Sequence, residues 1–533
     1  MKKNNQQKNN NTEVGLIVVS VALLAAFIVF MILHPTVTID VIGSFFNKMI
    51  SGLGPFFLVI TFSTFIISLY LGFGKYGNVR LGDCKPEYSN FSYLSMMLLA
   101  SLASAALYWS FTEWAFYYEN PGLGMKPRST EALESSIGYQ FFHWGMVNQS
   151  LYTVTGVAIA YGVYVKKLKS FQTSAVCSAM LGEKAGIKTR TVLGKVVDFL
   201  VIFGVLGALS SSLGLAVPLA SGGLRQLFGW ETTPTVQVGI IVVIAIVYTI
   251  TSYLGTDKGM KMISNAAAGL CICFILYILF AGPTTFILKN AVNSLGHMFS
   301  NFVRMSLFTD PVAQTGFPEA WTIYFVAFYL NYVAMMGIFI AKISKGRTIR
   351  EIAVATIFGM TAGEMFLFGI DGSFSIHSFL SGKVDVVGLV NSGVGEQAVY
   401  EIMKVLPGGA VLLPVVMLLL VVGFVAPSMD SASLALAETV TKSGTPKMAL
   451  RIFMCALLAI IPLAIILSGA GFTPIKQIAI TISLPFLAII VGLEIGLFRW
   501  LRKDHKDLVH SETRSSDKAD GGTPGEEIQE AEA

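Results

Sequence analysis

Charged side chains are scarce in this sequence. Only 13% of its 533 residues are Asp, Glu, Lys or Arg, whereas 54% are hydrophobic, and the mean hydropathy is +0.68. Soluble domains carry about 25% charged residues, which cover their surface. The shortage of charge therefore excludes an ordinary soluble protein and predicts that most of the chain lies in a lipid bilayer.

Motifs of several enzyme and metal-binding classes are also missing. The five cysteines, at positions 84, 177, 271, 273 and 455, show no C-x-x-C spacing, which argues against structural zinc and disulfides. The sequence has no H-E-x-x-H zinc-protease motif, no G-x-S-x-G nucleophile motif and no G-x-x-x-x-G-K-[ST] phosphate loop. We therefore expect no enzymatic activity, no cofactor and no ATP-driven pumping.

Apolar segments long enough to cross a bilayer recur from Val14 to Trp500. A membrane-spanning helix needs about 20 predominantly apolar residues. The candidate spans lie near residues 14–34, 54–73, 91–118, 140–164, 193–218, 236–254, 262–281, 319–342, 350–370, 408–436, 448–469 and 476–500. The sequence therefore predicts an all-α integral membrane protein with about twelve transmembrane helices.

Basic residues fall in alternate loops, for example KKLK at 166–169, Lys258 and Lys261, and Lys345 and Arg347. The positive-inside rule places these loops and both termini in the cytoplasm, as in a multi-pass protein of the inner (plasma) membrane. Because the net charge of +5 is spread over short loops, no nucleic-acid partner is expected.

Three regions complete the predicted organisation. Residues 1–13 form a cytoplasmic N-terminal segment, residues 14–503 the transmembrane domain, and residues 504–533 a disordered cytoplasmic tail rich in charge, Gly and Ser. Within the domain, residues 286–305 are amphipathic rather than uniformly apolar. We expect this segment to be a helix on the outer membrane surface.

An aromatic stripe is the most informative feature of the eighth predicted span. Trp321, Tyr324, Phe328 and Tyr332 recur at helical spacing, and Tyr329 lies beside them. A trimethylammonium group has no N–H to donate, so proteins bind it against the negative faces of aromatic rings. The alternative is that these rings pack against lipid or neighbouring helices.

A second polar and aromatic group lies in the fourth predicted span. In the run FFHWGMVNQSLYTV, Trp144, Asn148 and Tyr152 lie near one helix face, with Gln149 beside them. Two such helices are suited to line one cavity, which favours an aromatic cage for a small methylated-ammonium solute over the lipid-facing alternative.

Several motifs resemble the betaine, carnitine and choline transporter family. They are HWG at 143–145, LFTDPVAQTGFPEAW at 307–321, KGMKMISNAAAGL at 258–270, SMDSAS at 428–433 and, above all, GIFIAKISKGRTIRE at 337–351. The resemblance covers roughly residues 50–500. It implies a LeuT-like fold, in which spans three to seven and eight to twelve are inverted repeats around a mid-membrane site and two N-terminal helices stand outside. It also implies a homotrimer to whose assembly the segment 286–305 contributes.

The resemblance also carries the family's cage positions onto this chain. They fall on Trp144, Gln149, Tyr152, Phe328, Tyr329 and Tyr332. Tyrosine hydroxyls and the Gln149 amide stand where relatives have tryptophans, and they add hydrogen-bond donors for a carboxylate or N-oxide. We therefore expect a secondary active importer of glycine betaine or trimethylamine N-oxide, working by alternating access. A channel is the alternative from another class, but a cage built from distant helices suits a bound solute better.

The coupling ion is less strongly indicated. Ala267 stands where sodium-independent carnitine exchangers of the family have an arginine, which favours a bound cation, namely sodium. Its ligands would be the Ser428 hydroxyl and backbone carbonyls near Leu99 and Leu102. Pro427 and Met336, in contrast, resemble the exchanger branch, so exchange without sodium and proton coupling remain alternatives.

Buried ionisable residues need a role, because an unpaired charge is costly within a membrane. The interpretation for Glu113 and Asp430 is structural, Asp198 is expected near the cytoplasmic interface with Lys195, and His143 is taken as a packing residue. Glu364 has no family counterpart, and proton coupling is the functional hypothesis for it.

Overall fold

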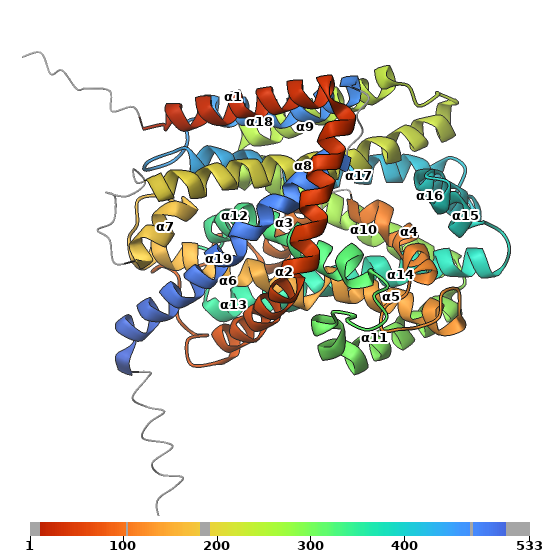
Figure 1. The fold of residues 1–533 in the computed structure, drawn as a ribbon, viewed down its shortest axis with the longest axis horizontal. Helices are drawn as coiled ribbons and strands as arrows, with labels where there is room; N and C mark the ends of the chain where they lie inside the picture. The colour runs from red at the N-terminus through yellow and green to blue at the C-terminus, as the bar shows by residue number, and fades with distance from the viewer. Residues whose placement is uncertain (1–10, 103–104, 182–191, 469–472, 508–533) are drawn as a thin grey trace, which may run out of the picture.

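The computed structural model describes residues 11–102, 105–181, 192–468 and 473–507 (Figure 1). Within these ranges every named element is a helix, and β-pairing is limited to two isolated bridges, Thr12 with Thr441 and Arg80 with Thr348. The predicted all-α class is therefore confirmed. Residues 1–10 of the predicted cytoplasmic segment 1–13 and residues 508–533 of the predicted disordered tail 504–533 lie outside the described residues.

The described residues form nineteen α-helices and three π-helical turns. In chain order they are α1 (Val14–Leu33), α2 (Pro35–Phe73), α3 (Asn90–Leu102), α4 (Ala105–Glu119), α5 (Thr130–Trp144), α6 (Met146–Tyr164), α7 (Thr173–Met180), α8 (Val192–Phe228), α9 (Pro234–Leu254), α10 (Lys261–Ala281), α11 (Thr284–Leu307), α12 (Ile323–Ile343), α13 (Ile349–Ala353), α14 (Thr361–Leu380), α15 (Val386–Asn391), α16 (Gly395–Lys404), α17 (Leu412–Thr439), α18 (Met448–Ser468) and α19 (Thr473–Asp504). Three π-helical turns, η1 (Thr256–Met260), η2 (Pro318–Thr322) and η3 (Val354–Met360), lead into α10, α12 and α14.

Eight helices among the described residues are long and apolar enough to cross a membrane, or nine if the bent pair α3–α4 counts as one span. Two further apolar stretches, Val14–Phe30 and Met448–Ala464, are shorter. The remaining predicted span, 140–164, is divided between α5 and α6. Every predicted span thus falls on a helix or a helix pair, but the count of twelve membrane crossings stays a prediction.

Some helices extend well beyond the predicted spans. Helix α2 begins at Pro35 rather than near residue 54, with proline in its first turn, where the missing N–H costs nothing. Helix α8 continues through Pro218 to Phe228 and is followed by Gly229 at φ +70°, a left-handed conformation that glycine adopts easily at a helix end. The predicted ends of these spans, which were chosen where the sequence becomes polar, therefore lie inside the observed helices.

Two helix breaks lie next to residues of the predicted site. Helices α3 and α4 meet at an angle of 63°. Helices α5 and α6 are separated by Gly145, whose backbone is extended at φ −94° and ψ −153°. A Cβ at Gly145 would collide with the carbonyl oxygen of Phe141. Such breaks free backbone polar groups for side chains or ligands, and they are tolerated in membranes where protein surrounds them.

Helix α12 lies at the centre of the bundle. In the continuous helical segment Pro318–Ile343, 89% of the 18-residue apolar stretch is buried inside the protein. It packs against α6, α8, α17 and α19, and Figure 1 shows α6, α12 and α19 close together. Helix α11, which covers the predicted surface segment 286–305, packs at the edge of the molecule against α5 and α14. The core of the fold is thus the α6–α12 pair.

Candidate functional site

Four of the predicted substrate-binding residues come together between the α5–α6 break and α12. Trp144 ends α5, Gln149 and Tyr152 lie in the first turns of α6, and Tyr329 faces them from α12. The rings of Tyr152 and Tyr329 stack, with centroids 5.4 Å apart. Trp144 stands nearly perpendicular to Tyr329, at 6.5 Å and 73°. All four side chains are buried. The three rings form an aromatic corner, with the Gln149 amide beside them.

The helix break supplies this corner with a backbone acceptor. The Tyr329 hydroxyl donates to the Trp144 carbonyl at 3.1 Å, and Gln149 Nε2 approaches the same carbonyl at 3.4 Å and the Tyr329 hydroxyl at 3.3 Å. A carbonyl in the last turn of a helix lacks its intrahelical donor, so it is free for these bonds. The break at Gly145 thus orients both the tyrosine and the glutamine.

Glu364 joins the same corner from α14. Gln149 Nε2 donates to Glu364 Oε1 at 2.6 Å, and the glutamate side chain is 1% exposed. The sequence marked Glu364 as an ionisable residue inside an apolar helix but did not place it beside the cage, because its neighbour Gln149 lies 215 residues away in the chain. An intramembrane carboxyl is itself the signal that points to a functional position.

The other predicted cage residues of α12 extend toward α8. Phe328 and Tyr332 lie 5.0 Å apart between ring centroids, and the Tyr332 hydroxyl donates to the carbonyl of Ala208 in α8 at 3.1 Å. Phe328 also meets Tyr329 edge to face, at 6.3 Å and 73°. These two rings therefore continue the aromatic surface to one side of the Tyr329 corner.

Trp321 and Tyr324 are placed differently. Trp321, in η2, packs against Tyr117 at 4.8 Å and against Trp109 and Phe116, all from α4. Tyr324 stacks on Phe328 at 6.4 Å. Trp321 thus packs mainly on the rings of α4 and also stacks on Phe325 at 6.4 Å, whereas Tyr324 contacts the rings of Phe325 and Phe328.

Two rings that sequence reasoning did not select complete the surroundings of Trp144. Phe325 lies edge to face with it at 5.4 Å, and Phe368 of α14 lies at 5.1 Å. Phe325 precedes Tyr329 by one helical turn, so its position on this face follows from helical spacing. Phe368 follows Glu364 by the same interval, but its place beside Trp144 depends on how α14 packs.

Glu113 and His143 form a buried hydrogen-bond chain behind Trp144. The Trp144 indole N–H donates to Glu113 Oε2 at 2.8 Å, and Tyr117 donates to the other carboxylate oxygen. Tyr117 also bonds His143 Nδ1 at 2.7 Å, while His143 Nε2 lies 3.0 Å from the Thr322 hydroxyl. Both nitrogens of His143 therefore have partners, and Glu113 fixes the orientation of the Trp144 indole.

Two of the residues proposed for sodium, Ser428 and Leu99, meet at the broken helix α3. The Ser428 hydroxyl donates to the Leu99 carbonyl at 2.8 Å and lies 3.2 Å from the Phe424 carbonyl. Leu102 is the last residue of α3, just before the break. Hydroxyl and carbonyl oxygens are the ligand types that hard cations accept, so the donor set fits sodium in kind. No group of three His, Cys, Asp or Glu side chains suited to a metal occurs among the described residues.

Two of the three positions that bear on the exchanger branch are tightly packed. Ala267 of α10 faces Gly423 of α17, where an added Cβ would lie 2.7 Å from the Ala267 Cβ. Met336 is fully buried in α12. A close contact of small residues brings α10 and α17 together at position 267, so a long side chain would not fit there without separating these helices.

The motif at 337–351 connects helices at the predicted cytoplasmic side. Lys342 pairs with Glu438 of α17. The Arg347 guanidinium donates to the Tyr88 carbonyl at 2.8 Å and lies 3.9 Å from the centre of the Tyr93 ring. These contacts tie the end of α12 to α3 and α17, so the motif contributes to the packing of these helices.

The other buried acids also have structural partners. Asp430 pairs with Arg451 of α18 at 2.6 Å and accepts from Ser252 at 2.5 Å. Asp198 accepts from Ser174 of α7 at 2.7 Å. Both carboxylates therefore join neighbouring helices and lie apart from the aromatic corner.

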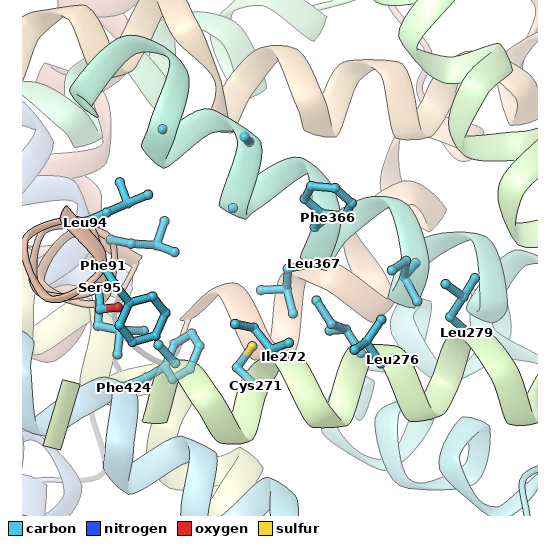
Figure 2. Close-up of a pocket in the computed structure, with 18 residues that line it drawn as sticks. Phe91, Leu94, Ser95, Cys271, Ile272, Leu276, Leu279, Phe366, Leu367 and Phe424 are labelled. Carbon is cyan, nitrogen blue, oxygen red and sulfur yellow. The ribbon is translucent and has the colours of Figure 1, made fainter. Parts of the chain in front are cut away.

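An apolar cavity of about 500 Å³ lies between α3, α10 and α14. Figure 2 shows Phe91 and Leu94 on one side, Cys271 and Ile272 below, and Phe366 across from them. Its walls are almost entirely apolar and include none of the predicted substrate-binding residues. A polar or charged solute would lose its hydration there without compensation, so this cavity does not suit one.

Comparisons with known proteins agree with the motifs. The sequence profile described as betaine/carnitine/choline family transporter matches residues 15–506. A carnitine transporter of Acinetobacter baumannii is 35% identical over 452 residues, which cover 84% of this chain and 81% of that protein. The uncharacterized transporter YeaV of Escherichia coli is 35% identical over 444 residues, covering 83% and 91%.

Among solved structures, a Na⁺-coupled sialic acid symporter aligns over 86% of both chains with 11% identity and a TM-score of 0.48. This likeness is too low to support a particular arrangement of repeats, so the LeuT-like repeat stays an expectation. The sequence relationships are decisive instead, because the family profile covers nearly the whole chain. This protein therefore belongs to the betaine/carnitine/choline family of secondary transporters and is not an enzyme.

Proposed function

We propose that this protein imports a small quaternary or methylated-ammonium solute by alternating access, with glycine betaine or trimethylamine N-oxide as the preferred candidates. The observation that carries the proposal is the buried corner formed by Trp144, Tyr152 and Tyr329. Aromatic faces attract an ammonium that lacks N–H groups, whereas the hydroxyls and the Gln149 amide suit a carboxylate or N-oxide.

The geometry indicates how the corner would hold such a head group. Tyr152 and Tyr329 are only 5.4 Å apart, which leaves no room between them for a methylated nitrogen, since carbon atoms in contact need about 3.5–4 Å. The stacked pair therefore acts as one wall. Trp144, perpendicular to Tyr329, supplies the second wall.

For coupling, we propose sodium symport through an ion held near Ser428 and the Leu99 carbonyl, with Leu102 beside the break in α3. The support is the 2.8 Å approach of the two oxygens. Exchange without sodium is the second candidate, because Pro427 has no side-chain oxygen to add to this pair. The relative named as a carnitine transporter makes carnitine a solute to test in that case.

Assembly and orientation form part of the same proposal. We propose a homotrimer in the inner membrane with both termini in the cytoplasm and with α11 contributing to the contact between subunits. The support is the apolar stripe on α11 that includes Leu288, Val292, Phe299 and Val303, all exposed in the single chain. Its test is cysteine cross-linking from position 292 in membranes, with position 289 as the control on the same helix.

The test is radiolabelled uptake into proteoliposomes that contain the purified protein. Glycine betaine, trimethylamine N-oxide, choline, carnitine and γ-butyrobetaine are compared, each with a sodium or a potassium gradient. Saturable uptake of betaine or trimethylamine N-oxide with counterflow supports a carrier, whereas flux without saturation would indicate a channel. A strong preference for carnitine over both would contradict the proposed substrate, and equal uptake in potassium would contradict sodium coupling.

A further inference from the structure

We propose that Glu364 sets the net charge accepted by the substrate site. A solute with one net positive charge is taken while Glu364 is ionised, and a zwitterionic solute is taken only together with a proton on Glu364. This inference rests on the proposed function of the aromatic corner, and it assigns to that site a charge-selecting residue outside the predicted cage.

The first support is the position of the carboxylate. Glu364 Oε1 accepts from Gln149 Nε2 at 2.6 Å, and the same nitrogen lies 3.3 Å from the Tyr329 hydroxyl. The distance from Glu364 Oε1 to the Tyr329 hydroxyl oxygen therefore cannot exceed the sum of these two distances. A head group bound against the Tyr329 ring would lie within direct electrostatic reach of Glu364.

The second support is a pair of buried acceptors without donors. Glu364 Oε2 and Gln149 Oε1 are enclosed, and neither has a hydrogen-bond partner in the part of the chain that the structure describes. Buried polar atoms are nearly always paired, because an unpaired one forfeits its hydration. A positive charge or a proton placed beside the two oxygens removes this cost.

The third support is the lack of a countercharge. Over the described ranges, no Lys, Arg or His nitrogen lies within 4.0 Å of the Glu364 carboxylate. The other buried acid of α14, Asp371, accepts from Ser110 at 3.0 Å. The nearby acid of α4, Glu113, is bonded to Trp144 and Tyr117.

The titratable groups on the remaining neighbours of α14 do not compensate Glu364 either. On α5, His143 is bonded to Tyr117 and Thr322. On α11, Lys289 is exposed. His297 interacts electrostatically with Glu131 of α5, and Arg304 does so with Tyr139 of α5. On α10, Cys271 lines the apolar cavity. The compensating charge is thus left to the solute or to a proton.

The size of the effect follows from Coulomb's law. Two unit charges about 6 Å apart, at an effective permittivity of about 20, change a binding constant by about a hundredfold. An ionised Glu364 attracts the ammonium group of a monocation. For a zwitterion it also repels the solute carboxylate, which offsets this attraction. Protonation of Glu364 removes the repulsion and adds an O–H donor for the solute carboxylate.

The experiment compares choline, a monocation, with glycine betaine, a zwitterion, in proteoliposomes at about pH 5.5 and about pH 8. In the wild type we expect betaine uptake to fall as the pH rises, while choline uptake does not fall. Glu364→Gln is expected to remove the pH dependence of betaine uptake and to lower choline uptake relative to betaine by about tenfold or more. Glu364→Asp should retain the wild-type pattern in weaker form.

Asp371→Asn is the matched control, because it removes a buried carboxyl from the same helix without touching the corner. It is expected to keep the wild-type ratio and pH profile. A Glu364→Gln protein with an unchanged ratio and profile overturns the inference while leaving the proposed function intact. If Glu364→Gln does not fold, betaine uptake in the wild type that is independent of pH, or that rises with pH, overturns it equally. Uptake of none of choline, glycine betaine and trimethylamine N-oxide by the wild type would contradict the proposed function itself.

Discussion

The indole nitrogen of Trp144 donates a 2.8 Å hydrogen bond to the carboxylate of Glu113. The bond joins the end of α5, where the chain breaks at Gly145, to α4, which follows the break in the third predicted span. An aromatic wall of the proposed site is thereby fixed to a helix that meets its neighbour at 63°. A change of that angle would move Trp144, so the bond links the two broken helices.

Loss of this bond should weaken solute binding. Glu113→Ala leaves the buried Trp144 N–H without an acceptor, which costs about 1–3 kcal/mol and should raise the KM for uptake by about tenfold. Glu113→Gln keeps an acceptor oxygen, so its KM should lie between those of the wild type and Glu113→Ala. The measurement is the concentration dependence of uptake, and Glu119→Ala, which removes a half-buried carboxylate paired with Arg128 at the end of the same helix, serves as the control. Equal KM values for the Glu113→Ala variant and the wild type would show that Glu113 does not position Trp144.

Tyr329 should separate the role of the ring from that of its hydroxyl. Tyr329→Ala removes a wall of the corner and should abolish saturable uptake, because the cation–ring attraction of about 1–2 kcal/mol and the packing around it are both lost. Tyr329→Phe keeps the ring but loses the bonds to the Trp144 carbonyl and to Gln149. We expect it to retain uptake of choline better than uptake of betaine.

Size-exclusion profiles of both Tyr329 variants establish that they fold. Tyr277→Phe is the matched control, because Tyr277 of α10 bonds the Pro407 carbonyl, away from the corner. Undiminished betaine transport by Tyr329→Ala would remove this residue from the proposed site.

Ser428 tests the coupling ion. Ser428→Ala removes the hydroxyl that lies 2.8 Å from the Leu99 carbonyl, so a sodium symporter should need about tenfold more sodium for half-maximal uptake. The measurement is uptake at varied sodium concentration with choline-free, potassium-balanced buffer. Ser378→Ala, which removes a buried hydroxyl bonded within its own helix, is the control. An unchanged sodium requirement would favour exchange without sodium.

Asp310 predicts a pH dependence outside the membrane-spanning segments. It lies in the loop after α11, and hydrogen bonds from the Thr315 hydroxyl and backbone N–H, at 2.6 and 2.7 Å, hold the pKa of its carboxyl below the ordinary value. A lowered pKa stabilises the folded loop above the ordinary value of about 3.9, and this contribution is lost as the pH falls through the lowered pKa.

The corresponding measurement is hydrogen exchange of residues 308–317 as a function of pH. We expect faster exchange in Asp310→Asn than in the wild type near neutral pH, and a difference that shrinks in acid. A difference independent of pH would show that the loop does not depend on the ionised carboxylate.

Much of this architecture is present in local sequence. Runs of apolar residues predict the helices because a bilayer admits little else, and the spacing of Trp144, Asn148 and Tyr152 follows from the helical period. The predicted ends of the helices were less accurate than the prediction that the helices exist. By composition alone the polar residues Asp40, Asn47 and Lys48 would end a span, yet they lie inside α2.

The sequence by itself determined the bilayer as the solvent, the helical class and the family, because these depend on composition, periodicity and motifs that need no long-range contact. Only the tertiary structure decided which residues lie together at the proposed site. It placed Glu364 beside Gln149, 215 residues away, grouped Trp321 with α4 rather than with Tyr329, and set Glu113 behind Trp144. The reason is physical: these contacts depend on the packing and rotation of helices far apart in the chain, which no local pattern encodes.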